Sequence, residues 1–65
     1  MMLTLDELRE IIELLQGAEK DAEKFDRGVG AAGVRLRKKC LDASKLLKGL
    51  RGLVLEVRES RKAKR

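Results

Sequence analysis

The residues of this 65-residue chain that offer chemistry are its lysines and arginines. Sixteen basic residues stand against eleven acidic ones, with no histidine and a single cysteine, Cys40. A lone thiol without a histidine partner is a weak candidate nucleophile, and it cannot complete a tetrahedral zinc site. We therefore expect no enzymatic activity, no metal and no cofactor, and we expect the cations to bind a partner.

The cations gather in the second half of the sequence. Residues 1–27 hold four basic and eight acidic side chains, a net charge of −4, whereas residues 28–65 hold twelve basic and three acidic ones, a net charge of +9. Such asymmetry in a small basic protein predicts a polyanionic partner. The candidate phosphate-binding residues are Arg35, Arg37, Lys38, Lys45, Lys48, Arg51, Arg58, Arg61, Lys62, Lys64 and Arg65.

Two stretches of apolar residues predict the helices that position these cations. In each stretch the apolar positions recur in alternating steps of three and four, which is the heptad pattern of a helix packed lengthwise on another. The first seam consists of Leu8, Ile11, Leu15, Ala18, Ala22 and Phe25. The second consists of Leu36, Cys40, Ala43, Leu47, Leu50, Val54 and Val57. Because it lies on this seam, Cys40 is expected to be buried.

Glycines predict a sharp turn between the two helices. The first helix should begin at a capping box, Thr4-Leu5-Asp6-Glu7, with Thr4 as the N-cap. Gly28 and Gly30 suit a left-handed helix terminus and a tight turn, so the helices should run antiparallel. We expect an all-α fold, a coiled-coil-like hairpin. Its parts are an acidic amphipathic helix at 1–27, a glycine turn and long basic helix at 28–60, and a frayed basic tail at 61–65.

A single hairpin of this size has little apolar surface to bury, so a partner is expected to stabilise it. Several apolar residues lie off the predicted seam: Val34, Leu41, Leu46, Leu53 and Leu55. We expect them to form a homodimer interface, which gives a four-helix bundle; the alternative is that they are ordinary surface residues. No apolar run reaches the ~18 residues of a membrane span and no signal-peptide pattern is present, so we expect a soluble cytoplasmic protein.

The glycine-rich run at 28–33 superficially matches a phosphate-binding loop, but no strand precedes it and no Lys-Ser/Thr pair follows. Two interpretations of residues 30–33 remain open. In one, free N–H groups in the first turn of the second helix bind a nucleic-acid phosphate beside Arg35 and Arg37. In the other, the small residues let the two helices cross closely.

Among polyanions the sequence favours double-stranded DNA. A long helix can place cations along a duplex, which carries one phosphate charge per ~1.7 Å of axis. One phenylalanine offers no platform for stacking single-stranded bases, and few side chains suit the reading of base edges. We therefore expect binding by charge and shape with little sequence preference. Alternatively, some cations pair with the acidic helix and set the orientation of the hairpin.

The run GVGAAGVRLRK followed by KLLKGLR resembles the bacterial linker-histone-like proteins, the chlamydial-type histone-like family. The resemblance spans about residues 5–60. The matching positions are Gly28, Ala31, Ala32, Gly33, Arg35, Arg37, Lys38, Lys45, Leu46, Lys48, Leu50 and Arg51. The family tends to place a polar residue and a lysine where this chain has Val29 and Gly30, and many members carry a long Lys/Ala/Pro-rich tail, reduced here to SRKAKR.

This resemblance implies a nucleoid-associated protein of the bacterial cytoplasm that binds and compacts double-stranded DNA. The short tail makes bridging or local coating by an oligomer the expected mode. The competing hypothesis is a coiled-coil oligomerisation or adaptor module with no nucleic-acid role. A third, a membrane-surface or calmodulin-type basic helix, is disfavoured because the apolar seam has a paired helix ready to cover it.

Overall fold

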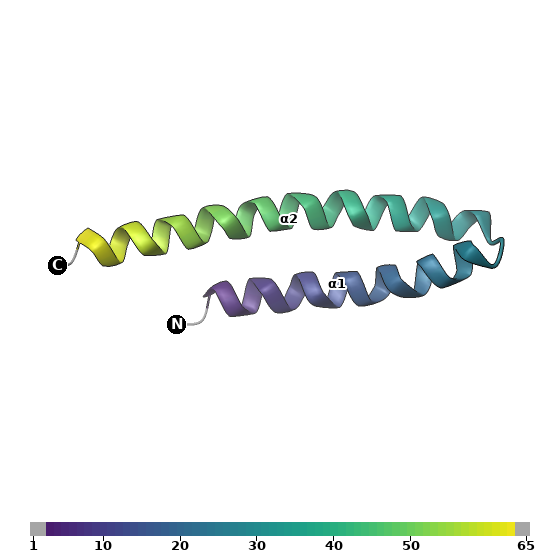
Figure 1. Ribbon diagram of the computed structural model, residues 1–65, viewed down its shortest axis with the longest axis horizontal. Coiled ribbons are helices and arrows are strands. Elements are labelled where there is room, and N and C mark those ends of the chain that lie inside the picture. The colour runs from purple at the N-terminus through teal and green to yellow at the C-terminus, as the bar shows by residue number, and fades with distance from the viewer. Residues whose placement is uncertain (1–2, 64–65) are drawn as a thin grey trace.

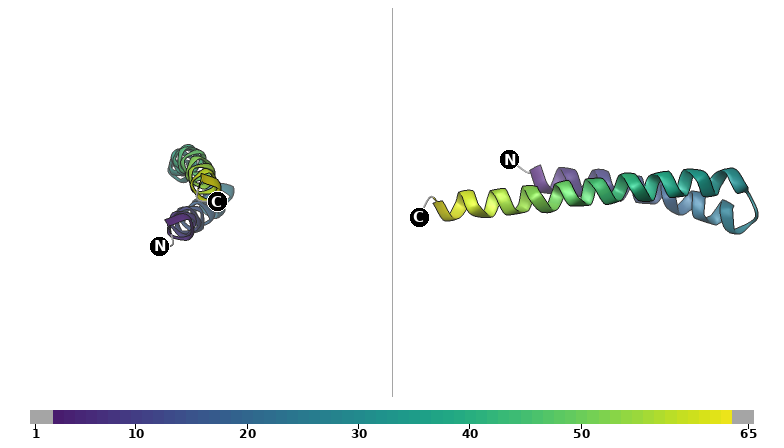
Figure 2. Two further views of the ribbon diagram at one scale, coloured as in Figure 1. Left: turned by 90° about the vertical axis from the view of Figure 1, so that its left-hand side faces the viewer. Right: turned by 90° about the horizontal axis from the view of Figure 1, so that it is seen from above.

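The computed structural model describes residues 3–63 of the chain, which form two α-helices and no strand. Helix α1 spans Leu3–Asp26 and helix α2 spans Gly30–Ala63, with 24 and 34 residues respectively. The helices run antiparallel and lie side by side, giving a rod of 56 × 16 × 11 Å (Figure 1). Figure 2 shows the same pair from its end and from above. The predicted all-α hairpin is therefore confirmed for the described residues.

The turn between the helices is closed by backbone hydrogen bonds. The N–H of Val29 donates to the carbonyl of Lys24 at 3.0 Å, and the N–H of Gly28 donates to the carbonyl of Phe25 at 2.9 Å. This pair of bonds defines a Schellman motif, which needs a residue in the left-handed region at its second-last position. Gly28 supplies it with φ of +102°. The predicted break at this glycine is confirmed.

Both helices reach beyond their predicted outer ends. Helix α1 begins at Leu3, so Thr4 lies inside the first turn and is not the N-cap. Helix α2 continues to Ala63, so the predicted fraying after Ser60 is wrong for residues 61–63. Arginine, lysine and alanine are good helix formers, and cations in a last turn are favoured by the helix dipole. Lys64 and Arg65 lie outside the described residues.

The core of the hairpin is small. Ile11, Ala18, Ala32 and Ala43 are its buried apolar residues, and Ile11 is the one large side chain among them. The face of α1 that meets α2 runs through Ile11, Leu14, Ala18 and Asp21, with the predicted Ala22 half-buried beside them, rather than through the predicted Leu8 and Leu15.

The predicted seams therefore need correction at five positions. Leu8 and Leu15 of α1 are 41% and 45% exposed, Leu47 and Val54 of α2 are 43% and 42% exposed, and Cys40 is also exposed. The physical reason is that the residues of α1 fit two overlapping heptad patterns with spacings of three and four, one through Leu14 and the other through Leu15. The first of these also brings Asp21 to the cations of α2, and the hairpin adopts it.

Two glycines allow close approach between the helices. A Cβ atom at Gly33 would lie 2.6 Å from Cδ1 and Cε1 of Phe25, so the ring occupies the space of the missing side chain. A Cβ atom at Gly17 would lie 3.4 Å from Nζ of Lys39, whose side chain passes over this point of α1. The position of Gly17 in mid-helix thus has a structural explanation.

These contacts fix the register of the hairpin. Gly33 lies beside Phe25, Lys39 beside Gly17, and Leu46 shares a shallow groove with Leu14. Continued along the rod, this pairing places the start of α1 level with Leu55. Residues 56–63, which we call the overhang, therefore extend past α1, as Figure 1 shows. Their length is about 12 Å at ~1.5 Å per residue.

The hairpin has two unlike flanks. Asp21, Arg35 and Lys39 lie on one, which we call the ion-pair flank. Positions around the axis of α1 follow from ~100° of rotation per residue. Relative to Ile11, Asp21 lies on one side of the contact face, and Leu8, Ile12 and Leu15 lie on the opposite side. The same rotation per residue places Cys40, Leu47 and Val54 of α2 on the side opposite the ion-pair flank. We call this second side the apolar flank.

Candidate nucleic-acid interface

A buried carboxylate joins the two helices. Asp21 is 5% exposed and accepts a hydrogen bond from Nζ of Lys39 at 2.6 Å on Oδ2, and another from Nε of Arg35 at 3.1 Å on Oδ1. The hydrogen bond from Lys39, followed by that from Arg35, lowers the pKa of Asp21 below its ordinary value of 3.8. Because both cations stabilise the charged form, this carboxylate stays ionised at neutral pH.

This arrangement gives Arg35 an internal role. Arg35 belongs to the predicted phosphate-binding set, yet its Nε is bonded to Asp21. Its side chain remains 48% exposed, which leaves much of the guanidinium open to solvent. Sequence reasoning missed both Asp21 and Lys39 as an interhelical pair. The available signal was that position 21 continues the three-four spacing of Ile11, Leu14 and Ala18.

The other predicted cations of the described chain are exposed on α2: Arg37, Lys38, Lys45, Lys48, Arg51, Arg58, Arg61 and Lys62. At ~100° per residue, Arg37, Lys48 and Arg51 fall within about 60° of arc around the helix. Lys38 and Lys45 lie next to this arc, on the side that points away from α1. We call these five residues the cationic face. Lys64 and Arg65 cannot be placed on it, since they lie outside the described residues.

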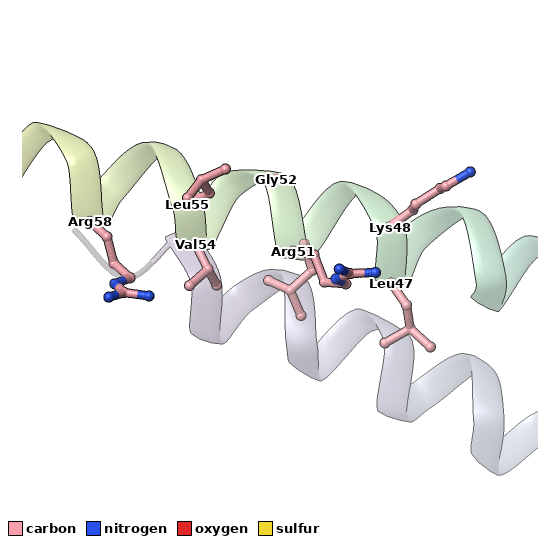
Figure 3. Close-up of a pocket in the computed structure, with 8 residues that line it drawn as sticks. Leu47, Lys48, Arg51, Gly52, Val54, Leu55 and Arg58 are labelled. Carbon is pink, nitrogen blue, oxygen red and sulfur yellow. The ribbon is translucent and has the colours of Figure 1, made fainter.

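A shallow groove crosses the C-terminal half of α2 and mixes apolar with basic side chains. It is lined by Leu47, Lys48, Leu50, Arg51, Gly52, Val54, Leu55 and Arg58, all from α2. Figure 3 shows Leu47 and Val54 directed to the side on which α1 lies, and Lys48 directed to the other side. The groove therefore connects the apolar flank with the cationic face.

Apolar side chains also interrupt the cationic face. Val34 is 72% exposed, and Leu41 and Leu55 are each 57% exposed. Val34 and Leu41 line a second groove together with Arg37 and Lys38. The cationic face therefore carries exposed apolar side chains between its basic residues.

The first turn of α2 favours one of the two interpretations of its glycines. Ala32 is fully buried, and its N–H donates to the carbonyl of Val29 at 3.1 Å. The ring of Phe25 packs against Gly33 so closely that a Cβ atom at this position would clash with it. Small residues at this position thus serve the close crossing of the helices. Binding of phosphate by the first-turn amides stays a prediction.

The described part of the chain has no helix that is both long and apolar enough to cross a membrane. Comparison with family models identifies the chain: residues 5–60 match the family described as histone H1-like protein Hc1. The chain belongs to this family, which confirms the resemblance seen in the sequence. Comparisons with characterised proteins and with solved structures gave no significant match.

Family membership carries a functional consequence. The family is one of histone H1-like, DNA-binding proteins of the nucleoid, and membership implies DNA as the partner of this chain. The cationic face of α2 is the part of the described structure whose charge and extent suit that partner.

Proposed function

We propose that this protein binds double-stranded DNA non-specifically through phosphate contacts, and that it coats or bridges the duplex in the bacterial nucleoid. The observation that carries the proposal is the run of exposed cations along one rigid helix. Within residues 3–63, the only two ion pairs are those that Asp21 makes with Arg35 and Lys39. The cations of the outer surface are therefore available to an external anion.

The five residues of the cationic face are the primary phosphate contacts in this proposal. Arg37 and Arg51 are fourteen residues apart, about 21 Å along the helix at ~1.5 Å per residue, so they can engage phosphates along a duplex. Arg35 contributes through the exposed part of its guanidinium. Arg58, Arg61 and Lys62 are auxiliary cations, and Lys64 and Arg65 are assigned the same role on sequence grounds.

We also propose that two hairpins associate as a homodimer, in a four-helix arrangement. The support is the contrast between a core with one large buried side chain, Ile11, and eleven large apolar residues that remain at least 40% exposed. Exposed apolar area of this kind marks interaction surfaces on small proteins. Two copies would also present two cationic faces, as bridging of duplexes requires.

The experiment that tests DNA binding is a salt titration. Wild-type protein is compared with Lys38→Gln/Lys45→Gln and with Lys20→Gln/Lys24→Gln, which makes the same change of charge on exposed positions of α1. We expect the first variant to bind duplex DNA more weakly. The slope of log K against log salt should become shallower by about 2, because each lost phosphate contact contributes about 0.9. The α1 variant should keep nearly the wild-type slope.

A second arm uses duplexes of unrelated sequence and single-stranded DNA of the same length. Equal affinity for the duplexes and weaker binding to the single strand are expected. Equal slopes for all three proteins would show that the cations of α2 are not the phosphate contacts. Loss of binding at ~150 mM salt for the wild type would leave a coiled-coil module without a nucleic-acid role as the better hypothesis.

A further inference from the structure

The apolar flank has no partner within the hairpin. Leu8, Ile12 and Leu15 of α1 are 41%, 46% and 45% exposed, and Leu47 and Val54 of α2 are 43% and 42% exposed. In the register of the hairpin these residues lie level with residues 43–54 of α2, around the middle of the rod. They form a largely apolar surface shared by both helices, with Arg51 beside Leu47 and Val54 in the same groove.

The overhang presents cations to the same side. At ~100° per residue, Arg58, Arg61 and Lys62 are turned toward the apolar flank or along the seam, where α1 no longer covers the helix. Glu56 and Glu59 point to other sides of the helix. The uncovered extension of α2 therefore combines exposed cations with Val57, which is half-buried.

The other end of the apolar flank is acidic. Glu19, Glu23 and Asp26 are exposed on α1 and lie on the side of Ile12 and Leu15. The neighbouring cations Lys20 and Lys24 are turned away from this side. One flank of the hairpin thus runs from a basic overhang through an apolar middle to an acidic end.

We propose that a second copy of the chain covers the apolar flank in an end-to-end reversed orientation, so that α2 of each copy packs on α2 of the other and the overhang reaches the carboxylates at the acidic end of the α1 beside it. This inference rests on the homodimer of the proposed function and specifies its geometry. An interface with its two-fold axis through the apolar middle is self-complementary, because the basic end of each copy meets the acidic end of the other.

The register of the hairpin agrees with this geometry. Leu50 lies level with Leu8, near the centre of the apolar surface, and Glu19 lies level with Lys39. Lys39 and Arg61 are each eleven residues from Leu50, on opposite sides of it. A two-fold rotation about the level of Leu50 therefore brings Glu19 of one copy to the level of Arg61 of the other.

The area required is within reach of the hairpin. A stable interface buries about 800 Å² on each partner. The surface of one hairpin is 5640 Å², so the dimer needs roughly one seventh of it. One flank of a rod 56 Å long can supply this share, and most side chains at its middle are apolar, as at interface centres.

This geometry divides the basic residues between two tasks. Arg58, Arg61 and Lys62 face carboxylates of the second copy, whereas Lys38, Lys45 and Lys48 point away from the apolar flank and stay free for DNA. Arg51, which lines the groove beside Leu47 and Val54, lies at the edge of the interface between these two sets. Cations of the overhang should therefore matter for self-association more than for the affinity for DNA.

The test is a charge-reversal series measured by sedimentation equilibrium on the full chain. Glu19→Lys/Glu23→Lys and Arg58→Glu/Arg61→Glu should each raise the dimer dissociation constant by about tenfold or more, since attractive pairs become repulsive. Combining all four changes should restore association most of the way to the wild-type value. Glu10→Lys/Glu13→Lys, on other sides of α1, is the matched control and should have little effect.

Two further measurements keep the outcomes distinct. Circular dichroism establishes that each variant remains helical. The exposed thiol of Cys40, which lies on the apolar flank, should react more slowly with a thiol reagent in the wild type than in Glu19→Lys/Glu23→Lys at the same concentration. Equal rates in a helical variant, a wild type that stays monomeric at micromolar concentration, or failure of the combined variant to recover would each overturn the proposal.

Failure of the DNA-binding proposal would look different. In that case the wild type shows no salt-dependent binding to duplex DNA, while the charge-reversal series still moves the dimer equilibrium. If the dimer geometry is wrong, the salt slope of Lys38→Gln/Lys45→Gln still falls, but the charge reversals leave sedimentation unchanged.

Discussion

Nζ of Lys39 lies 2.6 Å from Oδ2 of Asp21, across the point where Gly17 leaves room for the lysine side chain. The pair connects α2 to α1 inside a contact face that is otherwise apolar or small. A charged pair in such a place fixes which positions of two helices meet, because a shift along the rod would leave the carboxylate buried without a partner. It therefore sets the register on which the two flanks depend.

This pair predicts a loss of stability in acid. The pKa of Asp21 is lowered by Lys39 and Arg35, so its contribution is fully present above the ordinary value of 3.8 and is lost as the pH falls below that value. Asp21→Asn should unfold at a lower temperature than the wild type at pH 7, and the two should converge in strong acid. Thermal unfolding followed by circular dichroism at fixed protein concentration measures this, with Glu13→Gln as an exposed control. A difference that persists unchanged into strong acid would contradict it.

Arg35 and Arg37 should respond differently to the same substitution. Arg35→Ala removes one of the two partners of Asp21, so it should lower the unfolding temperature. Arg37→Ala changes an exposed residue of the cationic face and should leave the unfolding temperature nearly unchanged while it makes the salt dependence of DNA binding shallower by about 0.9. Thermal unfolding and salt titration of both variants provide the two readouts. Identical behaviour of the two arginines would refute this division.

Alanine at Gly33 should destabilise the hairpin, whereas alanine at Gly49 should stabilise it. The new methyl at position 33 would meet the ring of Phe25 at 2.6 Å, which costs about 1 kcal/mol or more through displacement of the ring. Position 49 is in open space, so its gain in helix propensity of about 0.5–1 kcal/mol is unopposed. Chemical denaturation gives both values. In a Phe25→Ala background Gly33→Ala should become favourable, and no such reversal would mean that the ring is not the obstacle.

Gly28 should tolerate substitution less well than Gly30. Its φ of +102° lies in the left-handed region, where an alanine costs about 1–2 kcal/mol. Gly30 begins α2 without a positive φ and has no atom near its missing Cβ, so Gly30→Ala should be neutral or slightly stabilising. Denaturation midpoints of the two single variants test the pair. Equal losses at both positions would argue against a Schellman turn at Gly28.

The sequence alone predicted the helices, the turn and the direction of the chain. Gly28 was identifiable because few other residues end a helix in the left-handed region. The rotation of α1 about its axis was predicted less well. Leu14 and Leu15 both complete a three-four pattern, and only the reach of Lys39 to Asp21 distinguishes them. That reach depends on contacts between residues eighteen apart in the chain.

The candidate site was predicted in outline. Charge asymmetry indicated α2 and its cations, since that signal needs no tertiary information. The internal use of Arg35 could not be separated from an external one, because an arginine looks the same in a sequence in either role. The exposure of Cys40 was likewise missed, as its seam position lies at the edge of the contact face.

The turn at residues 27–29 also has a kinetic consequence. Only three residues separate the helices, so closing the hairpin costs little chain entropy and can proceed within microseconds to milliseconds. Contacts can then form outward from the turn, from Phe25 and Gly33 to Leu14 and Leu46. Any meeting of two copies is a later, bimolecular event. The time needed to assemble should therefore shorten as the chain becomes more concentrated, while the time needed to fold stays the same.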